Sequence, residues 1–294
     1  MEWPRLPAYR PLVMGVLNVT PDSFSDGGRY RDAVAAIEAG RVMLGQGADL
    51  LDVGGESTRP GAPATPADIE QARVVPVIAA LAAAGAMVSV DTRNASTMLA
   101  ALAAGARIVN DVSALRHDPA AAGVLAAADC QVILMHMRGD PTDMTARKAY
   151  GDIAEDVTNE LAERVDFAVA AGIARHRIAV DPGVGFAKGM AENLALLPRL
   201  SVLGRLGCPI VVGVSRKGFL GLLSGEADPA KRAPGSIVAG LVAVQQGASM
   251  LRVHDVAETV QAMRVWRGLG QASLTPALSR REKTAPSPSG RGPG

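Results

Sequence analysis

The sequence has few aromatic residues and few cysteines, and its opposite charges nearly cancel. Phe, Trp and Tyr make up 3% of the 294 residues, and 30 basic residues balance 29 acidic ones, which leaves a net charge of +1. The low net charge argues against a nucleic-acid-binding surface, and the shortage of aromatics argues against a stacking platform for single strands. The chain also has no Gly-Lys-Ser/Thr phosphate loop, no dinucleotide fingerprint and no nucleophile elbow.

Segments that would direct the chain to a membrane or a disulfide-rich compartment are also missing. The N-terminal residues MEWPRLPAYRP lack the apolar core of a signal peptide. Pro76 and Gly85 interrupt the apolar stretch 74–90, which we expect to form the end of a helix and then a strand. Cys130 and Cys208 each precede an apolar run, and we expect buried, reduced thiols. We therefore expect a soluble, cytoplasmic protein.

Short apolar runs recur eight times, and Ala-rich stretches with helical spacing separate them. Eight strand-helix units predict a closed parallel (β/α)8 TIM barrel of the α/β class, which takes about 250 residues as one domain. The predicted strands are Leu12–Leu17, Asp49–Val53, Met87–Val90, Arg107–Val109, Val132–Met135, Ile178–Val180, Pro209–Val212 and Met250–Val253. The predicted helices are Arg31–Gln46, Pro66–Ala84, Asn94–Ala104, Pro119–Ala128, Asp152–Ala171, Ala191–Leu200, Lys231–Gln246 and Val256–Trp266.

The domain organisation follows from composition. Residues 1–270 are predicted to form the barrel, and residues 271–294, rich in Pro, Ser, Gly and Arg, are predicted to be a disordered tail. Two connections at the carboxyl ends of the strands, residues 18–30 and 54–65, are long and rich in Gly, Pro, Ser and Asp. Loops of about 12 residues with this composition are typical of lids over an active site, although simple disorder is the alternative.

Acidic and amide residues close several of the predicted strands, on the face where barrels of this type carry their active sites. Asp52, Asp91 and Asp181 each lie at the end of an apolar run, and Asn110 closes another. Singly, such an Asp is more often a helix cap or a turn former. Together they suit a flat heterocycle, because a carboxylate pairs with two parallel N–H donors and an amide supplies both a donor and an acceptor.

Cationic residues follow the last two predicted strands. Lys217 lies in the segment Gly213-Val-Ser-Arg-Lys-Gly, and Arg252 and His254 share one face of the final strand. The loops after strands seven and eight of such barrels often bind phosphate. An ion pair inside the barrel is the alternative for Arg252. Another histidine, His136, has no second His at metal-binding spacing, so a packed or lid-supporting histidine is expected there.

Long motifs at these positions resemble those of the dihydropteroate synthases of the folate pathway, from about Val13 to Trp266. They are LNVTPDSFSDGG, LDVGGESTRPGA, VSVDT, IVND, LMHMRGDP, DPGVGFAK, GVSRKGFLG and LRVHDV, in the family's order. The resemblance implies condensation of 6-hydroxymethyl-7,8-dihydropterin diphosphate with 4-aminobenzoate, giving 7,8-dihydropteroate and diphosphate, in an ionising, SN1-like substitution. It also implies competition by sulfonamides and a homodimer.

The resemblance assigns roles residue by residue. The pterin pocket would consist of Asp91, Asn110, Met135, Asp181 and Lys217. The diphosphate would contact Asn18, Asp52, Thr58, Arg59, Arg252 and His254, with Asn18 also binding Mg²⁺. The aminobenzoate site would consist of Phe24, Pro60, Phe186, Lys217 and Gly218. The reacting groups would contact Asp26, Lys217, Arg252 and His254.

The chain departs from the family at Gly218, where many members carry Ser or Arg. In the members with Ser, the hydroxyl helps hold the aminobenzoate carboxylate. Here the N–H groups at the start of the following helix would have to suffice. Three alternatives stay open at this point. They are a pterin-binding barrel related to the corrinoid methyltransferases, a lysine Schiff-base aldolase that uses Lys217, and an inactive paralogue that only binds pterin.

Overall fold

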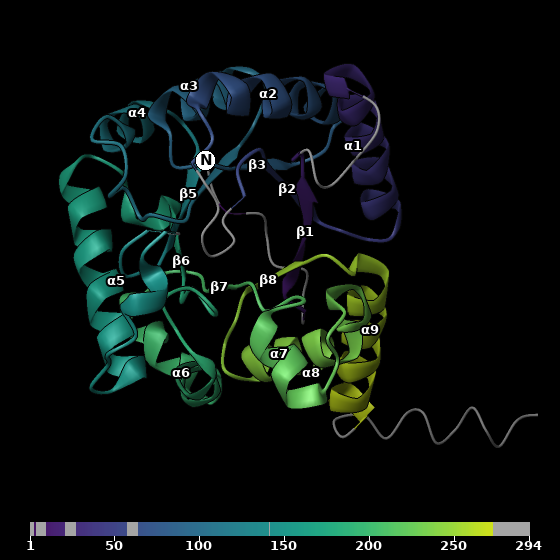
Figure 1. Cartoon of the computed structure of the whole chain (residues 1–294), viewed down its shortest axis with the longest axis vertical. Coiled ribbons are helices and arrows are strands. Elements are labelled where there is room, and N and C mark those ends of the chain that lie inside the picture. The colour runs from purple at the N-terminus through teal and green to yellow at the C-terminus, as the bar shows by residue number, and fades with distance from the viewer. Residues whose placement is uncertain (1–2, 4–9, 21–27, 58–63, 141, 273–294) are drawn as a thin grey trace, which may run out of the picture.

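Parallel strands closed into a barrel form the centre of the structure, a computed structural model that describes residues 3, 10–20, 28–57, 64–140 and 142–272. The described residues form one eight-stranded sheet in the order β6-β5-β4-β3-β2-β1-β8-β7. A parallel bridge between Val180 and Ile210 joins the two edges of the sheet. The helices surround the strands as an outer ring (Figure 1). The predicted (β/α)8 barrel is therefore confirmed.

Each predicted strand is present to within a few residues. The strands are β1 Leu12–Asn18, β2 Leu50–Gly54, β3 Val88–Asp91, β4 Ile108–Asp111, β5 Gln131–Met135, β6 Ile178–Asp181, β7 Val211–Val212 and β8 Met250–Val253. The helices are α1 Gly28–Gly45, α2 Ala67–Ala83, α3 Ala95–Ala103, α4 Ala121–Ala127, α5 Ile153–Ala170, α6 Met190–Leu196, α7 Gly218–Ser224, α8 Ala233–Gln245 and α9 Val256–Ala272. Short 3₁₀ turns lie at Met144–Ala146, Arg175–Arg177, Leu197–Leu206 and Pro229–Lys231.

The helix ends follow simple backbone rules. Five glycines that each lie two residues after the end of a helix have φ between +85° and +108°, a conformation that favours glycine and ends a helix. They are Gly47, Gly85, Gly105, Gly172 and Gly247. The predicted helix Ala191–Leu200 is divided, because α6 ends at Leu196 and a 3₁₀ turn with Pro198 near its start follows. The eight predicted helices do not include α7, which is only seven residues long and contains two glycines; only the family resemblance implies a helix start after Gly218.

The core has two layers that reflect the alternation of side chains along each strand. The larger layer fills the space between the strands and the helices, with Leu51, Leu81 and Leu134 fully buried. A second cluster lies inside the barrel and contains Leu12, Met14, Leu50, Ile108, Ile133, Ala179, Val211 and Met250. These residues come from early positions in their strands, so this apolar layer fills the lower part of the barrel.

The register of the strands brings the polar strand ends together at the other end of the barrel, its mouth. Asn18 pairs with Gly54, Gly54 with Asp91, and Asp91 with Asn110, so one row runs across four neighbouring strands. The ladder hydrogen bonds fix this row, because each residue of a parallel strand has a defined partner on the next strand.

Several expectations fall wholly or partly outside the described residues. Most of the tail 271–294 lies there, and its first two residues, 271 and 272, end α9 instead of beginning a tail. The central parts of both predicted lids, residues 21–27 and 58–63, also lie outside the described residues. The stretch 74–90 forms the end of α2 and then β3, as predicted. No helix among the described residues is both long and apolar enough to cross a membrane.

Two adjacent residues of α3 test the assignment of the outer core layer. Met98 is fully buried, whereas Leu99 is 56% exposed. We expect Met98→Ala to lower the free energy of unfolding by about 2–5 kcal/mol, because it removes buried apolar groups and leaves a cavity. The matched variant Leu99→Ala should change it by less than about 0.5 kcal/mol. Urea unfolding followed by circular dichroism measures both, and equal losses would contradict this packing.

Candidate active site at the barrel mouth

A single arginine joins two carboxylates inside the mouth of the barrel. Arg252 donates from Nε to Oδ2 of Asp52 at 2.6 Å and from Nη2 to Oδ2 of Asp91 at 2.8 Å. The Asp52 side chain is fully buried and that of Asp91 is 10% exposed. The ion pair inside the barrel, one of the two interpretations of Arg252, is therefore present. Neither of these two hydrogen bonds uses the Nη1 donors of Arg252.

Asp52 lies beneath the mouth rather than on its surface. Its Oδ2 also accepts a hydrogen bond from Nδ2 of Asn110 at 3.0 Å, and the residue has no exposed surface. It therefore acts on the mouth through Asn110 and Arg252. The Oδ1 atoms of Asp52 and Asn110 are both buried without a hydrogen-bond partner. An unpaired buried oxygen is costly, and the amide oxygen of Asn110 is free for a ligand donor.

Burial shifts the proton affinities of the charged groups at the mouth. It raises the pKa of Asp91 to about 7, because desolvation outweighs the attraction of Arg252 and the charge of Asp52 adds repulsion. Burial likewise raises the pKa of Asp181, and it lowers the pKa of Lys217 to about 8. It lowers the pKa of His254 to about 4, so this imidazole is neutral near neutral pH.

A pocket at the mouth brings together the residues predicted for the heterocycle. Its lining includes Asp91, Asn110, Met135, Asp181 and Lys217. Other lining residues are Val112, Gly183, Val184, Phe186, Gly213 and Arg252. The ammonium of Lys217 lies 4.2 Å from the centre of the Phe186 ring. An Asp181 oxygen accepts a hydrogen bond from the backbone N–H of Gly183 at 2.7 Å. Carboxylates, an amide and apolar walls thus surround one space.

The segment between β7 and α7 is held by its neighbours. Arg216 has a φ of +58°, which is uncommon for a residue with a side chain. Its guanidinium pairs with both carboxylate oxygens of Asp255, and its backbone N–H donates to Ser236 Oγ. Ser215 Oγ accepts from the backbone N–H of His254 and lies 3.0 Å from its Nδ1. These contacts hold the segment in which Lys217 lines the pocket, and they join that segment to His254.

Asn18 is the described candidate for holding a cation. It is half-buried at the end of β1, and its carboxamide oxygen lies 3.7 Å from where a Cβ atom on Gly54 would be. A Mg²⁺ ion that acts on a diphosphate typically takes one or two protein oxygens and completes its shell with phosphates and waters. A single amide oxygen at the rim fits that kind of site.

Five predicted site residues lie outside the described residues, and their roles stay predictions. They are Phe24 and Asp26 in the first lid and Thr58, Arg59 and Pro60 in the second. The stem of the second lid is described. Glu56 forms a buried ion pair with Arg93 at 2.9 Å, and its Oε1 accepts a hydrogen bond from the backbone N–H of Thr65 at 3.0 Å.

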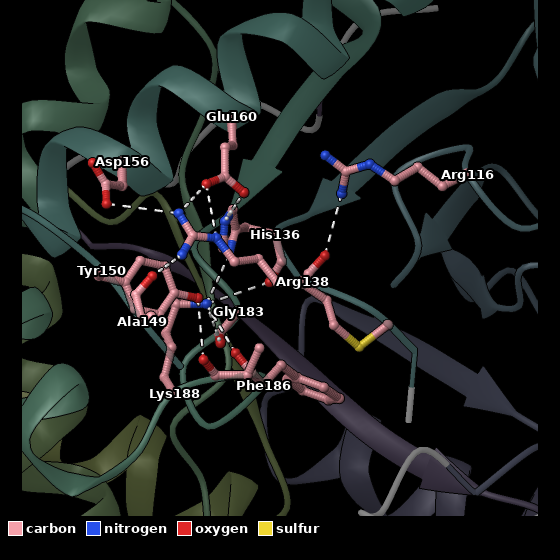
Figure 2. Close-up of polar contacts among 12 residues, drawn as sticks. Arg116, His136, Arg138, Ala149, Tyr150, Asp156, Glu160, Gly183, Phe186 and Lys188 are labelled. Atoms are coloured by element: carbon pink, nitrogen blue, oxygen red, sulfur yellow. Dashed lines mark hydrogen bonds and ion pairs between the residues drawn. The ribbon is translucent and has the colours of Figure 1, made fainter. Parts of the chain in front are cut away.

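Sequence reasoning missed a buried polar network beside the pocket (Figure 2). His136 is packed and hydrogen-bonded, as expected, but its partners, Lys188 and Glu160, were not foreseen. Lys188 belongs to the motif DPGVGFAK, and its position after a predicted strand was the available signal. The two cysteines are buried and free, as predicted.

Comparisons with known proteins agree with this geometry. The family model described as pterin binding enzyme matches residues 14–254. The dihydropteroate synthase of Neisseria meningitidis serogroup C is 44% identical over 264 residues, which cover 89% of this chain and 93% of the relative. The Xanthomonas albilineans enzyme, solved with 7,8-dihydropteroate, superposes with a TM-score of 0.81 at 45% identity, covering 89% of this chain and 94% of that one. The Yersinia pestis enzyme, solved with a sulfonamide drug, has a TM-score of 0.85 at 41% identity, covering 92% and 100%.

The shared arginine gives a stability test. We expect Arg252→Met to lower the free energy of unfolding by about 3–5 kcal/mol, because it leaves two buried carboxylates without their cation. The loss should be larger at about pH 8 than at about pH 5, since protonation of Asp91 removes one of the unpaired charges at the lower pH. Arg205→Met, which breaks the exposed pair with Glu155, should cost less than about 1 kcal/mol. Chemical denaturation at both pH values measures this, and a loss for Arg252→Met as small as the control would contradict the arrangement.

Proposed function

The chain belongs to the pterin binding enzyme family, and we propose how its barrel mouth carries out the dihydropteroate synthase reaction. The enzyme condenses 6-hydroxymethyl-7,8-dihydropterin diphosphate with 4-aminobenzoate and releases 7,8-dihydropteroate and diphosphate. The observation that carries the proposal is the pocket in which Asp91, Asn110 and Asp181 lie with Arg252 and Lys217. Its carboxylates and amide complement the donor edge of a pterin, and its cations lie near the position of the leaving group.

The pterin takes the inner part of the pocket. Asp91 and Asp181 accept hydrogen bonds from its ring N–H and amino donors, and Asn110, whose Oδ1 is buried and unpaired, completes the pattern. Met135 is 4% exposed and forms a soft apolar wall. Lys217, which lines the same pocket, donates to an acceptor of the ring.

The diphosphate lies at the rim formed by β1 and β8. The Nη1 donors of Arg252 and the neutral imidazole of His254 donate to its oxygens, and Thr58 and Arg59 of the second lid add further donors. Asn18 would hold a Mg²⁺ ion against the diphosphate, and this ion would neutralise charge on the departing group. Asp52 supports this end indirectly, through its contact with Arg252.

Substitution proceeds through ionisation of the carbon–oxygen bond to the diphosphate. The pterin ring delocalises the resulting cation, and the carboxylate of Asp26 stabilises it when the first lid closes and excludes water. The neutral arylamine of 4-aminobenzoate attacks this cation. The protonated amine that forms is strongly acidic and loses its proton to the departing diphosphate or to water, so no strong base is needed. Lys217 contacts both the pterin and the aminobenzoate.

The aminobenzoate site lies at the outer end of the pocket. Phe186 provides a described wall, while Phe24 and Pro60 of the lids provide the rest. Gly218 is the first residue of α7, and a Cβ atom added there would meet no other atom within 4 Å. The carboxylate therefore reaches the backbone N–H groups at the start of α7 without obstruction, and sulfonamides compete for the same place.

A homodimer formed through barrel helices and a cytoplasmic location complete the proposal. Helices α7, α8 and α9 lie side by side (Figure 1). Each of them carries exposed large apolar side chains. Leu222 is 73% exposed, Val238 62%, Val265 57% and Leu269 72%. A second copy of the chain would bury this face, since an isologous contact repeats the same patch on both subunits.

The reaction and the role of Asp91 can be tested together. We expect the wild-type enzyme to release diphosphate only when both substrates and Mg²⁺ are present.

The affinity of the wild-type enzyme for pterin diphosphate should increase as the pH rises through about 7, because Asp91 then ionises and can accept two hydrogen bonds. Asp91→Asn should lose most of the affinity and this component of the pH dependence, whereas the exposed control Asp166→Asn should keep both. Calorimetry at several pH values checks the prediction, and identical titration curves for Asp91→Asn and wild type would contradict it.

The dimer is tested by sedimentation. We expect the wild-type chain to sediment as a dimer and the double variant Leu222→Asp/Leu269→Asp as a monomer, because charge on this face opposes burial. Leu99→Asp on α3 introduces the same charge on a helix outside the face, and it should leave the dimer intact. A wild-type monomer at micromolar concentration, or a dimer in the double variant, would refute the proposed interface.

A further inference from the structure

The loop between β6 and α6, residues 182–189, has a costly backbone conformation. Gly183 and Gly185 have φ values of +64° and +82°, and Ala187 has +51° despite its side chain. The backbone at Gly183 comes so close to β5 that a Cβ atom there would lie 1.9 Å from the carbonyl oxygen of His136. Glycine takes such φ values without strain, but Ala187 does not, and a strained residue of this kind persists only where surrounding contacts determine its conformation.

The ammonium of Lys188 supplies such contacts. Its Nζ donates to the carbonyl of Gly183 at 3.1 Å, to the carbonyl of Phe186 at 3.0 Å and to Nδ1 of His136 at 2.8 Å. The side chain is buried, with 4% of its surface exposed. An ammonium has three N–H bonds and no acceptor, so these three contacts can satisfy it; the carbonyl oxygen of His136 lies farther away, 3.5 Å from Nζ.

The contact with Lys188 also fixes the protonation of His136. Burial lowers the pKa of Lys188 to about 7. The ammonium form can only donate, so Nδ1 of His136 accepts from it and the ring proton lies on Nε2, which donates to Oε2 of Glu160 at 3.0 Å. Arg138 holds the other oxygen of Glu160. Figure 2 shows the resulting chain of contacts, which runs from the loop through the end of β5 to α5.

The loop carries one wall of the pocket. Phe186, whose own carbonyl oxygen accepts from Lys188, lies under the ammonium of Lys217. Asp91, Asn110 and Asp181 stand at strand ends, which the ladder hydrogen bonds place without help. Phe186 lies outside the strands, so its position depends on the contacts of the loop.

We propose that Lys188 is a positioning residue for the second substrate: supported by His136 and Glu160, it holds the loop 182–189 in the conformation that presents Phe186 to the aminobenzoate ring. This inference rests on the aminobenzoate site proposed above. Lys188 touches neither substrate and takes no part in bond formation. Its removal should therefore affect the binding of aminobenzoate much more than the binding of the pterin.

The main test compares two buried cations that both donate to backbone carbonyls. We expect Lys188→Met to raise the KM for 4-aminobenzoate by about tenfold to a hundredfold, the scale expected when a contact shifts by about 1 Å. The Kd for pterin diphosphate should stay at the wild-type value. Arg177, which donates to the carbonyls of Cys130 and Leu125 near the bottom of the barrel, is the control. Arg177→Met should lower the melting temperature and leave both constants unchanged.

A second pair of variants covers the case in which Lys188→Met does not fold. His136→Asn keeps an oxygen near the place of Nδ1 and so retains an acceptor for Lys188, whereas His136→Leu removes it. We expect the KM for 4-aminobenzoate to rise for His136→Leu and to stay near the wild-type value for His136→Asn. Equal KM values for the two variants would overturn the proposal.

Nitrogen NMR of the imidazoles gives a readout besides activity, and the chain has only four histidines. In the wild type we expect His136 as the neutral Nε2–H form, with a pKa of about 4 set by burial and by Lys188 and Arg116 against the opposing effect of Glu160. In Lys188→Met this pKa should rise, because the ammonium is gone.

The outcomes separate this proposal from the proposed function. A wild-type enzyme that forms no dihydropteroate from the two substrates contradicts the function. An active wild type together with an unchanged KM for 4-aminobenzoate in Lys188→Met contradicts the positioning role alone. A proton on Nδ1 of His136 in the wild type also contradicts it, since Lys188 then has no acceptor there.

Discussion

The ion pair of Arg252 with Asp52 and Asp91 is the interaction on which the mouth of the barrel depends. Two carboxylates inside a barrel would repel each other and take up protons, and one guanidinium between them reduces both effects. Asp52 lies below and anchors the arginine, while Asp91 keeps part of its surface for a ligand. Arg252 therefore compensates the charge of both carboxylates and still has donors for an anionic leaving group.

Side chains of the site are placed in two ways, one for residues at strand ends and one for residues in loops. Residues at strand ends are placed by the sheet, with the apolar layer beneath them as a floor. Residues in the loops need contacts of their own, and strain marks where these occur. The described residues with a side chain and a positive φ are Ala114, Leu115, Ala187 and Arg216, and all of them lie in loops that follow strands. Asp111 holds the first loop through Ser113 and Leu115, Lys188 holds the second, and Asp255 holds the third.

The sequence predicted the barrel and the acids and amide at its strand ends because both follow from local periodicity, whereas the resemblance to the dihydropteroate synthases assigned Met135 and Lys217 to the inner pocket. A short apolar run predicts a strand, and an Asp or Asn at its end is then predicted to lie at the mouth of the barrel, as Asp91 and Asn110 do. Pairing between distant segments has no such local signal. Glu160 lies 24 residues from His136, and Lys188 lies 52 residues from it. The motif DPGVGFAK by itself does not predict that its lysine, Lys188, faces inward. Helix α7 is too short and too rich in glycine to be predicted from periodicity.

The central claim is that the acids and amide of the mouth bind the pterin while Arg252 and His254 face its diphosphate. A crystal structure with an unreactive analogue of the pterin diphosphate tests it most directly. The account predicts that the pterin ring contacts Asp91, Asn110 and Asp181 and that the diphosphate lies against Arg252 and His254. A ring bound anywhere else, or a diphosphate directed away from β8, would contradict it.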